Sequence, residues 1–422
     1  MIETTATPPQ LLPTSGAPAS SNAVANATNV AHPPRRFVLW LAINQLISWG
    51  TLYYTFALLL EHFEKDFALS RVDAAFGLSL ALLAEGAGGF MVGRLIDAGH
   101  ARAVMAGGSL LAAVGLTAVS LAQNQWQLYG AWMIIGLAMS GTLYQPAFSV
   151  LIRRFPKDFR RAIITLTIIG GLSSTVFIPL TAWLIDDYGW RVAVALLALL
   201  HVLLCAPIHG YWLRFEPPAR VPGQGAAAIK LSEFTRQVPF WGLAIFFLLF
   251  TGIASAMAGH LVSILRERQL SEAWVVAIPA SIGLLQVAGR LLLFVTEKRV
   301  DVHQANRWIL LLLPAALSVL ALGLHSLWAG LLYGLLYGLA NGMITVVKAT
   351  AMATYVSQPR AASLNGLLAF PTAIARAAAP SLLAVMWTAT GDYGLGLTVL
   401  SVVAMVSVVA FWWAQNRALH AT

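Results

Sequence analysis

Twelve long runs of apolar residues, separated by short polar segments, constrain this chain more than any other feature of its sequence. A helix needs roughly 20 mostly apolar residues to cross the bilayer's hydrocarbon core, which is about 30 Å thick. With 59% hydrophobic and only 10% charged residues, the composition excludes an ordinary water-soluble protein. We therefore predict an all-α membrane protein with twelve transmembrane helices, at about 37–60, 74–96, 103–122, 126–152, 162–185, 192–212, 240–265, 273–295, 308–324, 327–355, 364–388 and 395–414.

The predicted spans fall into two groups of six, which we expect to form two bundles. The bundles are predicted at residues 35–212 and 239–415, and the polar segment 213–238 is predicted to be the cytoplasmic loop between them. Residues 1–34 are rich in Ala, Pro, Ser and Thr, so we expect a disordered cytoplasmic tail there. Residues 416–422 are predicted to form a cytoplasmic C-terminal tail.

Short matches in the same order relate the two halves. GRLID at Gly93–Asp97 ends the second span, and GRLLL at Gly289–Leu293 ends the eighth. GLA occurs at Gly136 in the fourth span and at Gly338 in the tenth. Weak internal repeats of this kind are typical of transporters built from repeated bundles, so we predict pseudo-symmetric halves.

The positions of Lys and Arg predict an orientation. If the N-terminus is cytoplasmic, the external segments hold only Lys65, Arg71, Arg191, Arg266 and Arg268, and the other loops hold most of the remaining basic residues. Basic residues close to spans are retained on the cytoplasmic side. We therefore interpret the net charge of +9 as a topology signal that faces anionic lipid, not nucleic acid. We expect a multi-pass inner-membrane protein with both termini in the cytoplasm.

The residue patterns of several other kinds of chemistry are missing from the sequence. It contains no phosphate-binding loop of the G-x-x-x-x-G-K type, no nucleophile paired with a base and no clustered metal ligands. The single cysteine, Cys205, lies in an apolar run and excludes a disulfide framework. We therefore expect no enzyme activity, no cofactor and no metal.

The segment after the second predicted span, GRLIDAGHAR, carries the most specific motif. A glycine-permitted turn would bring Asp97 and Arg102 to the cytoplasmic helix ends, where they could lock the two halves together. Gly93, Leu95, Asp97 and Arg102 resemble the G-x-L-x-D…R loop motif of the major facilitator superfamily. The resemblance covers Arg35 to about Arg417, and with Arg94 these residues form the predicted gating motif.

Within that superfamily, the chain is similar to the monocarboxylate transporters and their bacterial oxalate/formate exchanger relatives. The similar residues are Trp49, Gly50, Tyr53, Tyr54 and Phe56 in the first span, Arg102–Gly108, and Gln286–Arg290. In that group a span-eight arginine, four residues after an Asp or Asn, is associated with carboxylate binding. Arg290 matches the arginine, whereas Gln286 replaces the acid or asparagine. The first-span lysine of vertebrate members has no match here.

Four charged residues lie deep within predicted spans, where a charge is costly unless it faces a partner or a polar cavity. Arg376 is the first candidate for the substrate, because guanidinium binds carboxylate bidentately, and the alternative is an interhelical salt bridge or a carbonyl clamp. Arg290 could contact the substrate or serve a structural or gating role. Lys348 could be a second anion contact, or its flexible stem could carry the ammonium to the inner interface.

Glu85 is the only acid among these four residues, and it stands between apolar and glycine neighbours. It could bind and release a proton during transport, or it could form a permanent ion pair with a buried base. His260 is a second candidate for proton coupling, with a hydrogen-bonded histidine near the outer end of its span as the alternative.

Polar residues in the predicted first, fourth, tenth and eleventh spans could complete the site, because those helices line the central cavity in the superfamily that the chain resembles. A plain interhelical hydrogen bond is the alternative for each of them. The residues are Asn44, Gln45, Tyr53, Tyr54, Tyr144, Gln145, Asn341 and Asn365.

Together these features predict a secondary active transporter that moves a small organic anion, a monocarboxylate, by alternating access. Arg376 and Arg290 would neutralise the anion, and Glu85 would couple a proton. We expect a monomer whose partners are this small molecule, protons and the lipid bilayer. Two alternatives stay open, a major facilitator exporter of drugs or metabolites and a non-transporting membrane sensor or receptor.

Overall fold

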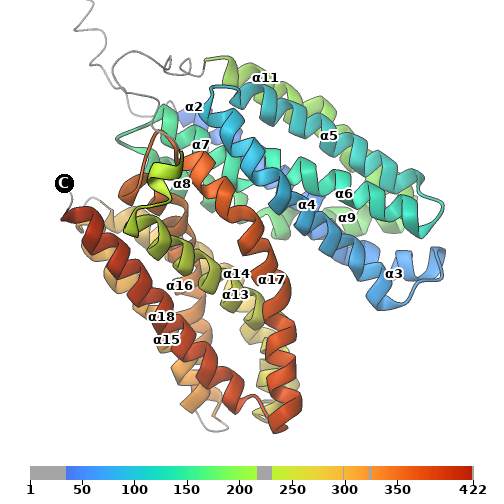
Figure 1. The fold of residues 1–422 in the computed structure, drawn as a ribbon. Coiled ribbons are helices and arrows are strands. Elements are labelled where there is room, and N and C mark those ends of the chain that lie inside the picture. Colours follow the sequence, from blue (N-terminus) through green and yellow to red (C-terminus); the bar gives the residue numbers. More distant parts are fainter. Residues whose placement is uncertain (1–34, 216–230, 298, 323–325, 421–422) are drawn as a thin grey trace, which may run out of the picture.

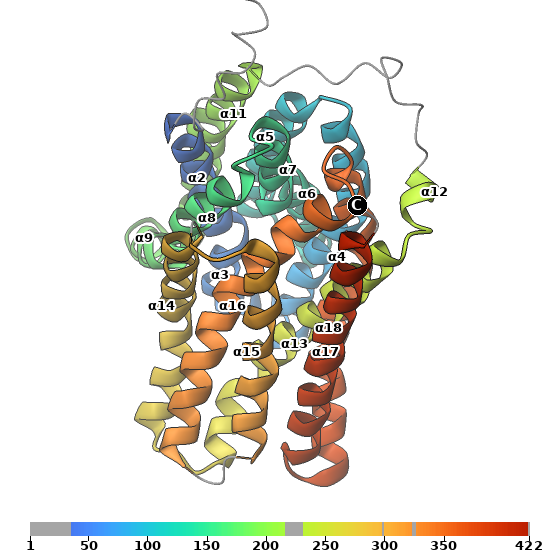
Figure 2. The same ribbon diagram turned by 90° about the vertical axis from the view of Figure 1, so that its left-hand side faces the viewer.

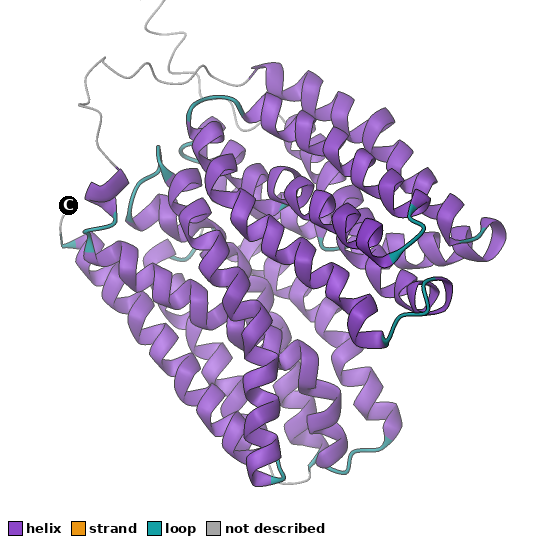
Figure 3. Cartoon of the chain, turned by 45° about the vertical axis from the view of Figure 1, so that its right-hand side comes forward, coloured by secondary structure: helices purple, strands orange, loops and turns teal. Residues whose placement is uncertain are grey.

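The computed structural model describes residues 35–215, 231–297, 299–322 and 326–420, and this part of the chain contains helices and no strand (Figure 3). The predicted tail 1–34, residues 216–230 of the predicted loop and residues 421–422 lie outside the described residues. Eleven helical segments of the described part are long and apolar enough to cross a membrane. A further helical segment, 35–66, precedes them and supplies the first span. The prediction of an all-α membrane protein is confirmed.

Most spans of the first bundle consist of more than one helical piece. The first joins α2 (Arg35–Trp49), the π-helical turn η1 (Gly50–Tyr54) and α3 (Thr55–Asp66), and only the next two are single helices. The other pieces are α4 (Arg71–Asp97), α5 (Ala101–Leu121), α6 (Gln125–Thr142), α7 (Tyr144–Arg154), α8 (Phe159–Gly170), α9 (Ser173–Tyr188), α10 (Trp190–Leu200), η2 (His201–Cys205), α11 (Ala206–Trp212) and η3 (Leu213–Phe215).

The second bundle is built from six longer helices, which Figure 2 shows lying side by side. They are α13 (Val238–Glu267), α14 (Glu272–Thr296), α15 (Val302–Leu322), α16 (Leu327–Tyr355), α17 (Ala361–Thr390) and α18 (Gly394–Leu419). A short helix, α12 (Leu231–Phe234), occupies part of the predicted interdomain loop. Helix α18 continues to Leu419, so residues 416–419 of the predicted tail belong to the last helix.

Internal hydrogen bonds explain how polar residues are tolerated inside the first span. Asn44 and Gln45 are fully buried, and their amides donate to the carbonyls of Cys205 at 3.3 Å and Thr142 at 2.7 Å. A buried amide that is hydrogen-bonded avoids much of the cost of leaving water. These two residues therefore hold the first span against its neighbours within the first bundle.

The two bundles meet at the end of the molecule where α2 begins and α18 ends. A shared apolar core there contains Phe37, Ile96 and Ile163 of the first bundle together with Leu293 and Val346 of the second. Two further apolar cores lie within the single bundles. Figure 1 shows the far ends of the bundles diverging from the region where α4 and α17 lie side by side.

Candidate functional site

Two pairs of helices carry ionisable residues across the junction between the bundles. Helix α4 of the first bundle packs along α17 of the second, and α8 packs against α14. Gly86 and Gly89 allow the close approach of α4, because a Cβ at either position would lie within 3.0 Å of Ala373 or Ala369 of α17. Each pair brings an arginine of the second bundle to the first.

Glu85 and Arg376 form an ion pair that joins the bundles. Nη2 of Arg376 donates to Oε2 of Glu85 at 3.1 Å, and both side chains are partly exposed, at 29% and 22% respectively. Ser255 of α13 holds the backbone of α17 at this point, since its hydroxyl donates to the Arg376 carbonyl at 2.6 Å. Nε of Arg376 is buried and has no hydrogen-bond partner within the described residues.

Lys348 lies beside this pair, and we call Glu85, Lys348 and Arg376 the charge cluster. Nζ of Lys348 donates to the hydroxyl of Thr251 at 2.7 Å and lies 5.4 Å from the centre of the Phe247 ring. It also interacts electrostatically with Glu85 and Arg376. The ammonium therefore points to α13, and the charge cluster holds two positive groups against one negative group.

Arg290 occupies the second helix pair, where it forms no salt bridge with any acid that the structure describes. Its side chain is 6% exposed, and Nη1 donates to the Thr167 carbonyl of α8 at 3.1 Å. The guanidinium interacts electrostatically with the phenols of Tyr54 and Tyr144. Nε is buried and unpaired as far as the described chain goes. Arg290 is thus a cation held by neutral oxygens.

Aromatic rings of the first bundle gather next to Arg290, and we call Trp49, Tyr53, Tyr54 and Tyr144 the aromatic cluster. A π-helical turn at 50–54 has i to i+5 periodicity, so Trp49 contacts both Tyr53, at a centroid distance of 5.4 Å, and Tyr54, at 6.5 Å. Trp49 also contacts Tyr144 at 4.9 Å. All four side chains are half-buried. The cluster extends along one face of the first bundle toward α14.

The remaining predicted contacts are less closely tied to these groups. Gln145 is exposed, and Asn341 and Asn365 are half-buried. The carbonyl of Asn341 accepts a hydrogen bond from the Thr345 hydroxyl at 2.6 Å. Within the residues that the structure describes, no side-chain hydrogen bond joins the three amides to Arg290 or to the charge cluster, so their role in the site stays a prediction.

His260 takes part in a clamp between α13 and α17. Its Nδ1 lies 2.8 Å from the Tyr393 hydroxyl, and its Nε2 lies 2.9 Å from the Pro380 carbonyl. Glu267 strengthens the same clamp, because it accepts from the backbone N–H of Tyr393 and from Trp387. This arrangement favours the hydrogen-bonded interpretation of His260.

The predicted gating motif lies where α4 meets the first turn of α17. Gly93 packs directly on the backbone, since a Cβ there would lie 2.3 Å from the Ala362 carbonyl oxygen. Oδ2 of Asp97 accepts from the Ser363 N–H at 2.8 Å. Arg94 and Arg102 are exposed. Within the motif, Asp97 and Gly93 therefore make the contact between the bundles.

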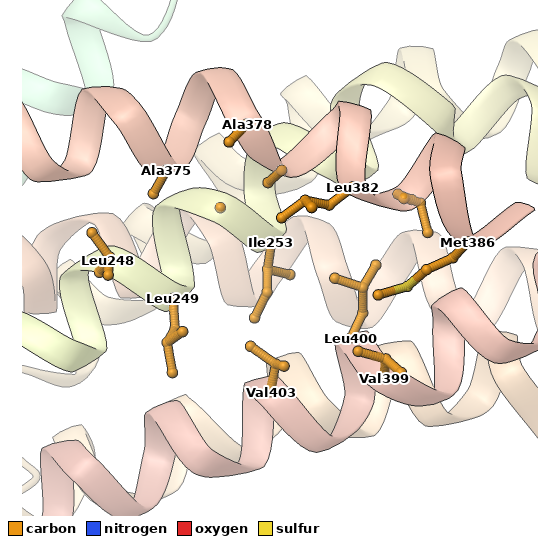
Figure 4. Close-up of a pocket in the computed structure, with 13 residues that line it drawn as sticks. Leu248, Leu249, Ile253, Ala375, Ala378, Leu382, Met386, Val399, Leu400 and Val403 are labelled. Carbon is orange, nitrogen blue, oxygen red and sulfur yellow. The ribbon is translucent and has the colours of Figure 1, made fainter.

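An apolar groove of about 260 Å³ lies elsewhere, between α13, α17 and α18 (Figure 4). Leu249, Ile253, Leu382 and Leu400 are among its lining residues, and none of its lining residues is a predicted site residue. No cluster of His, Cys, Asp or Glu that could hold a metal was found among the residues that the structure places.

The sequence matches a family profile over most of the first nine spans. The profile of the Major Facilitator Superfamily aligns with residues 41–313. The chain belongs to the Major Facilitator Superfamily. This membership confirms the predicted fold, two six-helix bundles, and the prediction that the chain is a membrane protein and not an enzyme.

Curated relatives place the chain near one branch of this superfamily. Human monocarboxylate transporter 11 is 34% identical over 205 residues, which cover 46% of this chain and 42% of that protein. Bos taurus monocarboxylate transporter 13 is 30% identical over 207 residues, covering 47% and 45%. The matched region thus spans less than half the length of these relatives. The predicted resemblance to monocarboxylate transporters is confirmed.

Solved structures of the superfamily share the fold of the whole chain. The human organic anion transporter MFSD10 superposes with a TM-score of 0.69 at 17% identity, covering 90% of this chain and all of that one. The E. coli fucose:proton symporter superposes with a TM-score of 0.71 at 13% identity, covering 92% and 99%. At such identities the likeness concerns the fold alone.

Sequence reasoning missed three contributors to this site. Thr251 and Ser255, which hold Lys348 and the backbone at Arg376, are ordinary polar residues of an apolar helix. Trp49 was noted only for a family resemblance, yet it is the residue that contacts the other three rings of the aromatic cluster. The spacing of Trp49, Tyr53 and Tyr54 was the available signal, because residues four or five apart share one face of a helix that contains a π-helical turn.

Proposed function

We propose that this protein is a secondary active transporter of a small organic anion with one carboxylate. One observation carries the proposal: Arg290 is buried and Lys348 is half-buried between membrane-spanning helices, and neither forms a salt bridge in the part of the chain that is described. Arg290 donates to a carbonyl and Lys348 to a hydroxyl, while the nearby Glu85 already pairs with Arg376. A membrane protein retains such cations at a cost, and a substrate anion would offset it.

The names of the relatives agree with this substrate class. Two curated relatives are monocarboxylate transporters, and one protein of the same fold is an organic anion transporter. Because the matched region covers less than half of the curated relatives, their substrate supports the proposal only as a class.

Alternating access would follow from the arrangement of the two bundles. The bundles are joined at the end with the termini, through Gly93, Asp97 and the shared apolar core, and they diverge at the other end (Figure 1). With both termini in the cytoplasm of the inner membrane, as the basic residues predict, this is an outward-facing state. Rocking of the bundles would then expose the face between them to the cytoplasm.

Proton coupling would use the pair that spans the bundles. A substrate carboxylate that passes the charge cluster as the bundles rock would compete with Glu85 for Arg376 and Lys348. A Glu85 carboxylate that loses its cationic partner in the membrane is costly and takes up a proton. Anion and proton would therefore cross together.

A binding experiment on the purified chain tests the proposal directly. Small monocarboxylates, neutral solutes and lipophilic cations are compared for their effect on thermal unfolding, because a ligand of the native state raises its stability by about 2.7 kcal/mol at 100 times its dissociation constant. We expect carboxylates alone to stabilise the protein. In proteoliposomes, the same carboxylates should be taken up in exchange for unlabelled carboxylate inside.

Variants test whether Arg290 and Lys348, the two cations without a salt bridge in the described chain, bind the carboxylate. We expect Arg290→Gln and Lys348→Gln each to weaken carboxylate binding by about tenfold or more, because hydrogen bonds to charged groups contribute about 1.5–3 kcal/mol. Arg417→Gln is the matched control, since Arg417 is exposed near the end of α18. Stabilisation by lipophilic cations alone would refute the proposal in favour of drug export, and binding without uptake would favour a sensor.

A further inference from the structure

We propose that the transported anion is an aromatic monocarboxylate, whose carboxylate binds Arg290 and whose ring packs against Trp49 and Tyr54. The inference rests on the proposed function, because it names the substrate class of the same site. It follows from unpaired buried donors that lie directly beside a cluster of aromatic rings.

Two buried N–H groups lack a hydrogen-bond partner here among the residues described. They are Nε of Arg290 and Nε1 of Trp49, from the second and the first bundle respectively. Buried donors in proteins are almost always satisfied, so an unpaired pair at one interface indicates a missing acceptor. A carboxylate fits because it offers two acceptor oxygens, no competing donor, and a charge opposite to that of Arg290.

The break in the fifth span fixes where these groups meet. A Cβ on Gly170 would lie 2.7 Å from the Tyr144 hydroxyl, and a Cβ on Gly171 would lie 2.5 Å from Nη1 of Arg290. Consecutive glycines therefore accommodate a group from the aromatic cluster and the guanidinium side by side. Tyr144 in turn contacts Trp49, so the unpaired donors belong to one continuous site.

The rings around these donors favour a flat, aromatic ligand. Trp49 packs edge-on against Tyr53 and tilted against Tyr54, both tyrosines are half-buried, and Tyr54 interacts electrostatically with Arg290 of the second bundle. A further aromatic ring gains edge-to-face or offset contacts in addition to the burial of apolar area. A saturated ring of the same size gains the burial alone. The predicted signature is therefore a preference between ligands matched in size and charge.

The experiment compares four probes on the purified full-length chain. Phenylacetate carries ring and charge, cyclohexylacetate is its saturated counterpart, acetate carries the charge alone, and 2-phenylethanol carries the ring alone. Dissociation constants come from ligand-dependent thermal unfolding, and labelled phenylacetate is then followed into proteoliposomes. We expect phenylacetate to bind about two- to tenfold more tightly than cyclohexylacetate, which is the range of aromatic pair interactions, and 2-phenylethanol not to bind.

Two substitutions at Trp49 separate its ring from its N–H. Trp49→Phe should weaken binding of both ring-bearing acids and keep a preference for phenylacetate, because it removes the N–H donor and leaves an aromatic ring in place. Trp49→Leu should also reduce that preference, because Tyr54 is then the only one of the two proposed ring contacts that remains. Thermal unfolding without ligand checks that each variant is folded. If the Leu variant does not fold, the Phe variant still tests the role of the N–H donor, because it keeps most of the packing.

The possible outcomes separate the two proposals. Carboxylates that bind with no difference between phenylacetate and cyclohexylacetate would overturn the aromatic inference and leave the proposed function standing. If none of the three carboxylates binds or is taken up, the proposed function itself is wrong. An aromatic preference that is unchanged in Trp49→Leu would also overturn the inference, because the ligand ring would then bind elsewhere.

Discussion

At the scale of single residues, Glu85 matters because it forms a salt bridge with Arg376 of the opposite bundle within the membrane-spanning region. Its partner Arg376 is shared electrostatically with Lys348, which donates to a neutral hydroxyl. One carboxylate cannot form a salt bridge with both cations at once, so an anionic substrate can replace Glu85 as the partner of either cation. The role of this acid is therefore best tested by removing its ability to ionise while keeping its shape.

Glu85→Gln should uncouple transport from the proton gradient. Glutamine can still accept a hydrogen bond from Arg376, but it cannot bind and release a proton. We expect proteoliposomes with this variant to exchange labelled for unlabelled carboxylate at a rate near that of the wild type, but to lose gradient-driven accumulation. Glu61→Gln, at an exposed position of α3, is the control. Continued accumulation by the Glu85 variant would exclude this residue as the proton carrier.

At the scale of helices, two spans that carry the site depart from regular α-helix next to the side chains of the site. The π-helical turn at 50–54 places Tyr53 and Tyr54 on Trp49, and the break after Gly170 leaves room for Arg290. Interruptions within membrane helices are tolerated where protein covers the freed backbone groups. The Thr167 carbonyl illustrates this, since it accepts from both Gly171 N–H and Arg290.

Gly171→Ala should impair binding more than folding. The new Cβ would displace the end of the flexible Arg290 side chain and would lie 2.9 Å from the Thr167 carbonyl oxygen, so that carbonyl must shift slightly and its hydrogen bond from Arg290 would be lost, while the helical φ and ψ of Gly171 suit alanine. We expect carboxylate affinity to fall about tenfold, with little change in thermal unfolding of the unliganded protein.

The control for this substitution is Gly107→Ala in α5, where a Cβ meets nothing within 4 Å. This variant should bind carboxylate like the wild type. Equal carboxylate affinities of Gly171→Ala and Gly107→Ala would show that carboxylate binding does not depend on the present position of the Arg290 side chain.

At the scale of the whole molecule, the two bundles pack together at the end that holds Gly93 and diverge at the other, and Asp97 makes a charged contact at the packed end. Its carboxylate accepts from Ser363 in the first turn of α17, where the helix dipole favours a negative charge. The interaction is worth about 0.3–1 kcal/mol, enough to change a population ratio about two- to fivefold. The contact can therefore bias the equilibrium between the two states of the transporter.

Asp97→Asn should shift that equilibrium toward the state that is closed at the far end. Spin labels at Lys65 and Ala273, both exposed at the diverging ends of the bundles, report the distance between them. We expect pulsed electron paramagnetic resonance to show a larger share of short distances between the two labels in the variant than in the wild type. An unchanged distribution would mean that the apolar core around Ile96 and Leu293 sets the equilibrium without Asp97.

The sequence by itself determined the membrane class, the number of spans and the family. These properties depend on local quantities, namely the length of apolar runs, the polar segments between them and a short loop motif, and each can be identified without knowing which helices touch. The four ionisable residues inside spans could also be found this way, because a charge among twenty apolar residues is visible in the sequence alone.

Only the tertiary structure decided which of those charges are partners. Glu85 and Arg376 are 291 positions apart, and Arg290 and Thr167 are 123 apart, so no helical periodicity relates them. Their pairing depends on how two bundles of similar composition pack, which is set by close contacts such as Gly93 on Ala362. The same packing turned Asn44 and Gln45 from site candidates into bonds within the first bundle and placed Trp49 beside Arg290. In a membrane, apolar surfaces predict burial in lipid or in protein equally well, and only the packed structure distinguishes the two.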